Sequence, residues 1–182
     1  TIIVNASNIT VGDIEKITVH VNEDATGVIN ITVEGKNYSA PIDKGIATFK
    51  IDNLASGSYD VLASYDGDEN YLPGTNTSSF SVGKHNAPIS VSAKDVKEGE
   101  NAVVHVILPA GATGSVKVTV YDKSYTNQLI DGKTTVTVPD LAKGSYIVNV
   151  NYSGDDNYLA NSTQVPLSVG KKAVEPPAIE NN

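Results

Sequence analysis

The residues that could do chemistry in this chain gather in one acidic turn, and the chain contains this turn twice. Residues 65–71 read YDGDENY and place Asp66, Asp68 and Asn70 at alternate positions, and residues 152–158 repeat the pattern as YSGDDNY. Carboxylate and amide oxygens at alternate positions open the calcium-binding loop of an EF-hand. The two turns are therefore the first candidates for a metal site.

An EF-hand loop also needs a bidentate carboxylate at its twelfth position. Counted from Asp66, that position holds Thr77, and its counterpart in the second turn is Gln164, so the sequence excludes an EF-hand. We favour a hairpin loop, in which Gly67 and Gly154 adopt a positive φ and the Asp and Asn side chains bind the local backbone. The alternative is a calcium site completed by backbone oxygens, and its candidate ligands are Asp66, Asp68, Asn70, Asp155, Asp156 and Asn157.

Other catalytic chemistry finds little support in the sequence. The absence of Cys excludes disulfides, thiol catalysis and Cys-ligated zinc. The three His residues are His20, His85 and His105, and no two of them have the spacing of metal ligands. No Gly-x-Ser-x-Gly elbow accompanies them, and the short acidic loops offer little cleft for glycoside hydrolysis. We therefore predict that the chain is not an enzyme and, apart from the calcium alternative, carries no cofactor.

Seven Asn-x-Ser/Thr sequons make N-glycosylation a candidate modification. Such an acceptor indicates a surface position in a secreted protein, although the excess over chance is modest in a chain so rich in Asn, Ser and Thr. The candidate acceptors are Asn5, Asn8, Asn30, Asn37, Asn76, Asn151 and Asn161.

The elements that position these residues follow from a duplication that covers nearly the whole chain. Tyr65 matches Tyr152, and the same offset of 87 residues aligns Lys84 with Lys171 without a gap. Within each copy, apolar and polar residues alternate with a period of two, and Gly- and Asp-rich turns separate the runs. We predict an all-β fold of two tandem immunoglobulin-like β-sandwiches with about seven strands each.

The duplication also sets the predicted domains. Gly, Asn and Pro interrupt the alternation near residues 83–88. We therefore expect the first sandwich at residues 1–84, the second at residues 85–171, and a Pro-containing linker or tail at residues 172–182.

One corner of each sandwich can be predicted in more detail. LASGSY (54–59) and LAKGSY (141–146) place a Tyr after a Gly-containing turn, at the start of a strand. Immunoglobulin-type sandwiches place a tyrosine at this point, and its hydroxyl group binds upstream backbone. The residues of the two structural corners are Leu54, Gly57, Tyr59, Leu141, Gly144 and Tyr146.

The pattern Leu-x-x-Gly-x-Tyr followed by Tyr-x-Gly-Asp-x-Asn-Tyr resembles the bacterial and archaeal Ig-like repeat modules, and the resemblance covers both copies almost end to end. The basic residues are all Lys and the chain is rich in Asn and Thr, which is similar to the adhesin-like surface proteins of methanogenic archaea. This resemblance implies a stalk or display module of a large extracellular cell-surface protein. It brings no catalytic residues with it.

Charge and composition narrow the expected partners. A formal net charge of −8 argues against nucleic acid or an anionic membrane as partner, and no apolar run approaches the length of a membrane span. We expect a monomer whose neighbours are further modules of the same chain. A glycan or protein on the surface of another cell is the expected partner of the complete surface protein. In the alternative function, the modules themselves bind surface carbohydrate or protein through loops or an exposed sheet face. The tyrosines shared by both copies, Tyr38, Tyr125, Tyr71 and Tyr158, would serve that function.

Overall fold

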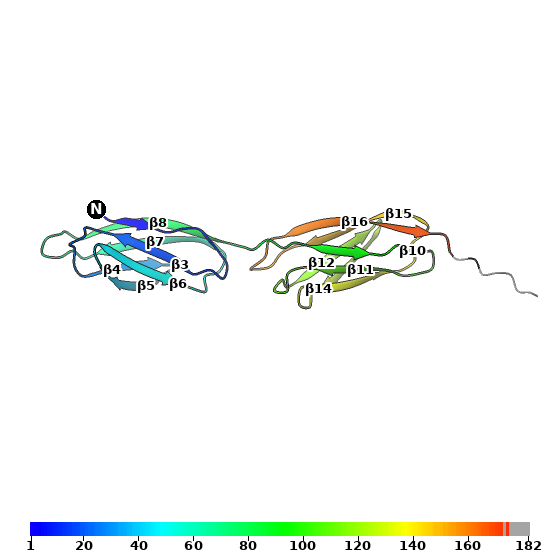
Figure 1. Ribbon diagram of the computed structural model, residues 1–182, viewed down its shortest axis with the longest axis horizontal. Coiled ribbons are helices and arrows are strands. Elements are labelled where there is room, and N and C mark those ends of the chain that lie inside the picture. Colours follow the sequence, from blue (N-terminus) through cyan, green and yellow to red (C-terminus); the bar gives the residue numbers. More distant parts are fainter. Residues whose placement is uncertain (173, 175–182) are drawn as a thin grey trace, which may run out of the picture. The chain divides into compact units, whose positions relative to one another are not determined.

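The structure is a computed structural model that describes residues 1–172 and 174. Within this part of the chain the regular elements are all β-strands, so there is no helix that could cross a membrane. The chain divides into two compact units, which we call unit 1 (Thr1–His85) and unit 2 (from Asn86 onward). Each is a two-layered, Ig-like β-sandwich, which confirms the predicted fold class (Figure 1). The predicted tail, residues 172–182, lies outside the described residues except for 172 and 174.

Unit 1 packs a three-stranded sheet, in the order β1-β3-β6, against a five-stranded sheet, in the order β2-β8-β7-β4-β5. Apart from the β2–β8 pair, neighbouring strands are antiparallel. The strands are β1 (Ile3–Asn5), β2 (Ile9–Thr10), β3 (Glu15–His20), β4 (Val28–Val33), β5 (Lys36–Pro41), β6 (Ile46–Ile51), β7 (Gly57–Tyr65) and β8 (Gly74–Gly83).

Unit 2 repeats this arrangement strand for strand, with sheets in the orders β14-β11-β9 and β10-β16-β15-β12-β13. Each unit has eight strands instead of about seven, because the first segment crosses from one sheet to the other and forms two short strands. The strands are β9 (Ser90–Ala93), β10 (Val96–Lys97), β11 (Ala102–Ile107), β12 (Ser115–Val120), β13 (Lys123–Gln128), β14 (Lys133–Val138), β15 (Gly144–Tyr152) and β16 (Asn161–Gly170).

The core of each unit consists of the apolar side chains that alternate along the strands. Ile17 and Val19 of β3 face Val61 and Ala63 of β7 across the sandwich, and all four are fully buried. Tyr59 is also buried and stacks on Phe80, with ring centroids 5.1 Å apart. A one-residue slip would turn every one of these side chains outward, so the alternation fixes the register of the strands.

One buried position breaks the apolar pattern. Glu15, at the start of β3, is 0% exposed and is the only buried charged side chain in the described part of the chain. Its Oε1 accepts a hydrogen bond of 3.2 Å from the backbone N–H of Ser7, and its Oε2 has no hydrogen-bond partner among the described residues. The equivalent residue of unit 2 is Ala102, which is also fully buried. Burial raises the pKa of Glu15, although the hydrogen bond from Ser7 opposes this.

Candidate functional site

The carboxylate of Asp68 holds two loops of unit 1 together. Its Oδ1 accepts hydrogen bonds from the backbone N–H groups of Asn70 (2.8 Å) and Tyr71 (2.9 Å) within the β7–β8 loop. Its Oδ2 accepts two more from Thr26 in the β3–β4 loop, one from the backbone N–H (2.9 Å) and one from the hydroxyl group (3.1 Å). The backbone groups of Thr26 and Asn70 contribute most to lowering the pKa of Asp68 to about 2.

Unit 2 has the same arrangement around Asp155. Its Oδ1 accepts from the backbone N–H groups of Asn157 (2.8 Å) and Tyr158 (2.6 Å), and its Oδ2 accepts from the N–H and the hydroxyl group of Thr113, both at 2.8 Å. Burial raises the pKa of Asp155, but these hydrogen bonds outweigh burial and hold it at about 2. Four hydrogen bonds to one carboxylate, with the same geometry in both units, make this feature a loop clamp.

The first tyrosine of each turn completes the clamp from inside the core. The hydroxyl group of Tyr65 donates to the carbonyl oxygen of Thr26, and that of Tyr152 donates to the carbonyl oxygen of Thr113, both at 2.8 Å. Burial raises the pKa of Tyr152 to about 12, so its phenol stays protonated and remains a hydrogen-bond donor. The same threonine is thus held through its N–H, its hydroxyl group and its carbonyl oxygen.

The glycine of each turn is required by the shape of the loop. Gly67 and Gly154 both have a φ of +83°, a conformation that residues with a side chain rarely adopt. A Cβ atom on Gly67 would lie 2.5 Å from the carbonyl oxygen of Tyr71, and one on Gly154 would lie 2.7 Å from that of Tyr158. Only glycine fits at this point.

These contacts bear on the candidate calcium ligands. Asp68 and Asp155 are committed to the clamp, and Asn70 and Asn157 take part in it through their backbone N–H groups. Across residues 1–172 and 174, no three Asp, Glu or His side chains gather in a way that could hold a metal ion. Calcium binding at these turns stays a prediction, and an ion there would have to displace hydrogen bonds from the Asp68 or Asp155 carboxylate.

The sequence reasoning missed Thr26, Thr113 and Asp24. The two threonines recur at the offset of 87 residues, and this repetition was the available signal. Asp24 has no such signal, since its counterpart is Gly111. The Oδ1 atom of Asp24 accepts a hydrogen bond from the hydroxyl group of Tyr71. In unit 1, Tyr71 therefore links the β7–β8 loop to the β3–β4 loop.

The opposite end of β7 forms the tyrosine corner. The hydroxyl group of Tyr59 donates to the carbonyl oxygen of Ala55, and that of Tyr146 donates to the carbonyl oxygen of Ala142, both at 2.6 Å. Leu141 of unit 2 is only 6% exposed, whereas Leu54 of unit 1 is half-buried. The two corners therefore share their hydrogen bond and differ in how completely the leucine is covered.

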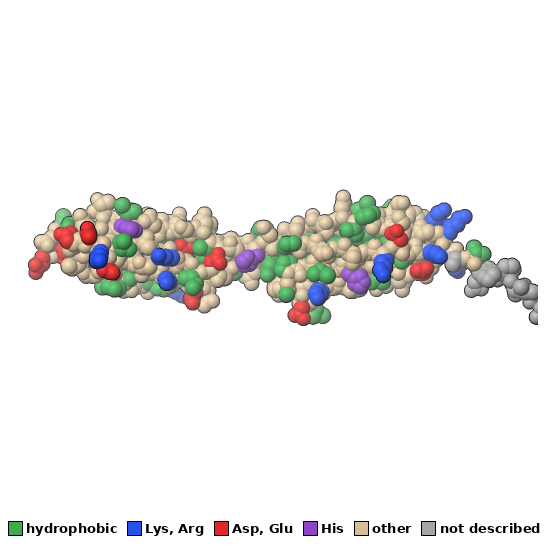
Figure 2. Space-filling view, in the orientation of Figure 1, with side chains coloured by type: hydrophobic (Ala, Val, Ile, Leu, Met, Phe, Trp, Pro, Cys, Tyr) green, Lys and Arg blue, Asp and Glu red, His purple; other side chains and the backbone are tan. Residues whose placement is uncertain are grey.

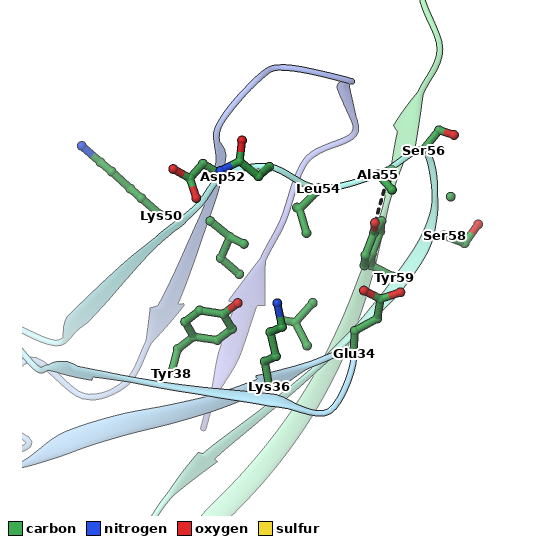
Figure 3. Close-up of a pocket in the computed structure, with 14 residues that line it drawn as sticks. Glu34, Lys36, Tyr38, Lys50, Asp52, Leu54, Ala55, Ser56, Ser58 and Tyr59 are labelled. Atoms are coloured by element: carbon green, nitrogen blue, oxygen red, sulfur yellow. Dashed lines mark hydrogen bonds between the residues drawn. The ribbon is translucent and has the colours of Figure 1, made fainter. Parts of the chain in front are cut away.

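A cavity of about 460 Å³ lies at the corner of unit 1. The segment after β6, including Asp52 and Leu54, forms one wall (Figure 3). Glu34, Lys36 and Tyr38 extend toward it from the β4–β5 hairpin. Its volume lies within the range of small-molecule sites. Its lining is more polar than apolar, and Val33, Ile51 and Leu54 contribute to the apolar part.

The seven sequon asparagines all lie at least partly on the surface, but their side-chain amides differ in their contacts. The Nδ2 atoms of Asn76 and Asn161 donate to backbone carbonyl oxygens, of Ile2 at 2.6 Å and Ala87 at 2.9 Å. Asn8, Asn30 and Asn37 accept hydrogen bonds through Oδ1. Asn5 and Asn151 are exposed and make no side-chain hydrogen bond to any described residue.

The fold and its repeated clamp define the two units as Ig-like β-sandwich domains in tandem. Residues 2–83, which make up most of unit 1, match the model of the family described as Bacterial Ig-like domain (group 3). No curated protein matches the sequence of the chain.

Several solved structures are similar to the chain at low sequence identity. The fibronectin(III)-like modules of CbhA from Clostridium thermocellum are 13% identical, with a TM-score of 0.41 and complete coverage of both chains. A tandem pair of titin Ig domains is 13% identical, with a TM-score of 0.36 and coverage of 94% of this chain and 97% of that one. Red sea bream transglutaminase is 13% identical, with a TM-score of 0.41, and the chain spans 31% of its length.

Proposed function

We propose that this chain is a non-enzymatic, load-bearing segment of an extracellular adhesin-like protein, in which tandem Ig-like domains form a stalk that displays a binding end at the cell surface. The observation that carries this proposal is the attachment of the first strands of each unit to its last strand. Such an attachment decides how a domain responds when its two ends are pulled apart.

In unit 1 the second and the last strands run side by side in the same direction. β2 pairs with β8 in parallel, with Ile9 opposite Val82 and Thr10 opposite Gly83. The backbone N–H of Val11 extends this ladder with a 2.9 Å hydrogen bond to the carbonyl oxygen of Gly83. A force that pulls the two ends of the domain apart therefore acts along the strands and loads these bonds together in shear, instead of opening them one at a time.

Side chains reinforce the same attachment. Asn8 Oδ1 accepts a hydrogen bond of 2.9 Å from the backbone N–H of Ser81 in β8, and Asn76 of β8 donates to the carbonyl oxygen of Ile2. The start of unit 1 is thus tied to its last strand at two points besides the ladder.

Unit 2 is attached in the same way. β10 pairs in parallel with β16. Asp95 Oδ1 accepts from the backbone N–H of Ser168 at 2.9 Å, and Asn161 donates to the carbonyl oxygen of Ala87 at 2.9 Å. Asp95 lies at the offset of 87 residues from Asn8, whereas Asn161 is 85 residues from Asn76. The second contact is therefore reproduced by a residue at a different position of the repeat, which supports a role for the contact itself.

The surface and the composition support an extracellular display role. Uncharged polar side chains and backbone cover most of the face in view, with acidic and basic side chains scattered among them (Figure 2). The Lys-only, Asn- and Thr-rich composition is similar to that of the adhesin-like proteins of methanogenic archaea, and this resemblance is the reason for proposing them as the source class. In this proposal, the two units have neighbouring modules of the same chain as partners. The binding end of the stalk binds a glycan or protein of another cell.

Single-molecule force spectroscopy on the two-unit chain tests the proposal. Two separate unfolding events are expected, each releasing a contour length of about 300 Å for a unit of some 85 residues, less its folded span. The forces should exceed those of a domain whose terminal strands unzip. Unfolding at forces no higher than those of such a domain would contradict a load-bearing role. Labelling of intact source cells with an antibody against the chain tests the surface location separately.

A further inference from the structure

Lys36 lies at the corner cavity of unit 1, and its counterpart in unit 2 is Lys123. Lys123 binds the loop that precedes the corner tyrosine of unit 2, which we call the corner loop. Lys123 is half-buried, and its Nζ donates to the carbonyl oxygens of Pro139 (2.6 Å) and Asp140 (3.4 Å). Lys36 occupies the same position of the repeat, yet it is exposed and has no hydrogen-bond or ion-pair partner among the described residues. Lys36 is therefore a donor that the fold of unit 1 leaves unused.

The corner leucines of the two units also differ, in how much of each side chain is exposed. Leu141, next to the lysine contact of unit 2, is 6% exposed, whereas Leu54 is half-buried and forms part of the cavity lining. Below Leu54 the cavity reaches Val33 and Ile51, which are buried core residues. The floor of the cavity is thus a small apolar area, and most of the lining around it is polar.

The polar groups around the cavity carry both signs of charge. Lys36 and Lys50 are matched in number by Glu34 and Asp52, so the rim carries no net charge and does not favour an ion as ligand. Figure 3 shows Lys36 and the hydroxyl-bearing ring of Tyr38 on the side of the β4–β5 hairpin, facing the loop that contains Asp52 and Leu54. A ligand between them meets hydrogen-bond donors and acceptors around an apolar floor.

We propose that this cavity binds one neutral hexose unit of a glycan. A hexose presents hydroxyl groups around its edge and an apolar C–H face, which match the mixed rim and the apolar floor of Leu54, Val33 and Ile51. The volume of about 460 Å³ is sufficient for a single sugar ring. Lys36 donates to sugar hydroxyl groups in place of the loop carbonyls that Lys123 binds in unit 2, and the ring of Tyr38 forms a side wall.

This site goes beyond the load-bearing role and does not depend on it. Force spectroscopy measures the attachment of β2 to β8, which involves none of the cavity residues, so either proposal can fail while the other stands.

Chemical-shift mapping of the backbone amides of the two-unit protein tests the site. Glucose, galactose, mannose and N-acetylglucosamine are titrated separately, with glucuronate as the charged comparison. The expected result is saturable shifts of amides in residues 52–58 with at least one neutral sugar, at a dissociation constant of about 1 mM, as befits a ligand of this size. The absence of saturable shifts with every neutral sugar, or binding of glucuronate alone, would overturn the proposal.

Matched variants locate the binding. Lys36→Ala removes an exposed side chain that has no partner among the described residues, so it should preserve folding and weaken binding at least tenfold. Tyr38→Phe removes only the hydroxyl group and provides a second, milder test. Lys123→Ala in unit 2 is the control and should leave the affinity unchanged. Equal loss of affinity in the Lys36 and Lys123 variants, or no loss in either cavity variant, would show that the sugar binds elsewhere and would refute the assignment.

Discussion

Asp68 accepts two hydrogen bonds from Thr26, a residue 42 positions earlier in the chain, and thereby joins the β7–β8 loop to the β3–β4 loop. Replacing Asp68 with Ala leaves two backbone N–H groups of its own loop and two groups of Thr26 without this acceptor. We expect Asp68→Ala to lower the midpoint of thermal unfolding of unit 1 by several degrees. Asp66→Ala is the matched control, because the Asp66 side chain is exposed and makes no hydrogen bond to the described residues, and it should leave the midpoint unchanged.

The clamps also predict a pH dependence of stability. The folded pKa values of Asp68 and Asp155 are lowered from 3.8 to about 2, so the unfolded chain binds protons more readily than the folded one. The stability that the clamps contribute is present above pH 4 and is lost as the pH falls through the range from 3.8 to about 2. Urea unfolding across this range measures it, and a double variant of Asp68 and Asp155 to Asn should show a flatter profile. An unchanged slope in that variant would contradict this origin.

Glu15 should act in the opposite direction. Its folded pKa is raised, so the stability of unit 1 is highest when the carboxyl group is protonated and falls as the pH rises from the unfolded value of 4.5 through the folded one. Because Oε2 is buried without a partner, Glu15→Ala should stabilise unit 1 at neutral pH by about 1–3 kcal/mol and remove this dependence. The reverse substitution in unit 2, Ala102→Glu, should destabilise it. Urea titrations at two pH values measure both effects, and a less stable Glu15→Ala protein would contradict the expectation.

A comparison of Gly67 with Gly12 separates the steric cost of an added Cβ atom from the cost of a positive φ. A Cβ atom on Gly67 meets the Tyr71 carbonyl oxygen at 2.5 Å in addition to the unfavourable φ of +83°, and we expect Gly67→Ala to cost about 3 kcal/mol of unfolding free energy. Gly12 also has a positive φ, +95°, but a Cβ atom there has nothing within 4 Å. Gly12→Ala should therefore cost only about 1 kcal/mol. Denaturant unfolding of the two variants provides the comparison, and equal losses would show that the contact with Tyr71 has no effect.

The fold was predictable from the sequence because the same alternation appears in both copies. Ile17 and Val19 have the same phase as Val104 and Val106, and a pattern that survives duplication reports which face is buried. The tyrosine of the corner was predictable for a similar reason, since its spacing from Leu and Gly is local. Contacts within one turn can be read from neighbouring residues.

Contacts between distant segments could not be predicted in this way. The partner of Asp68 is Thr26, and nothing local to the acidic turn specifies it. Lys36 and Lys123 are the same residue at the same repeat position, yet only Lys123 binds the corner loop. Glu15 lies in the buried phase of its strand, but the sequence does not show that its Oε2 lacks a partner. Such differences arise from packing across the sandwich.

The side-chain contacts of the sequon asparagines predict where glycans attach. A glycan is linked to Nδ2, and in Asn76 and Asn161 this atom donates to the backbone of the first segment of the unit. In Asn5 and Asn151 the amide is exposed and makes no hydrogen bond to the described residues. If the source cell glycosylates this protein, Asn5 and Asn151 should carry more glycan than Asn76 and Asn161. Peptide mass spectrometry of protein from the source measures site occupancy, and preferential occupancy of Asn76 or Asn161 would contradict the prediction.

The attachment of the first to the last strands predicts a mechanical effect that can be assigned to one unit at a time. Asn8 and Asp95 occupy equivalent positions, and each accepts a hydrogen bond from the backbone N–H of the last strand of its own unit, at Ser81 and Ser168. Asn8→Ala should lower the unfolding force of unit 1 and leave that of unit 2 unchanged, and Asp95→Ala should do the reverse. Each substitution should cost only about 1 kcal/mol at equilibrium, since it removes one hydrogen bond at the surface.

Force spectroscopy of the two variants and their combination measures the effect. In each single variant one of the two unfolding peaks should move to lower force, and in the combination both should move. Asn5→Ala in β1 is the control, because its side chain is exposed and makes no hydrogen bond to the described residues. If both peaks keep their force in the combined variant while its equilibrium stability falls, these side chains stabilise the fold without bearing load, and the shear geometry must rest on the β2–β8 and β10–β16 backbone pairs alone.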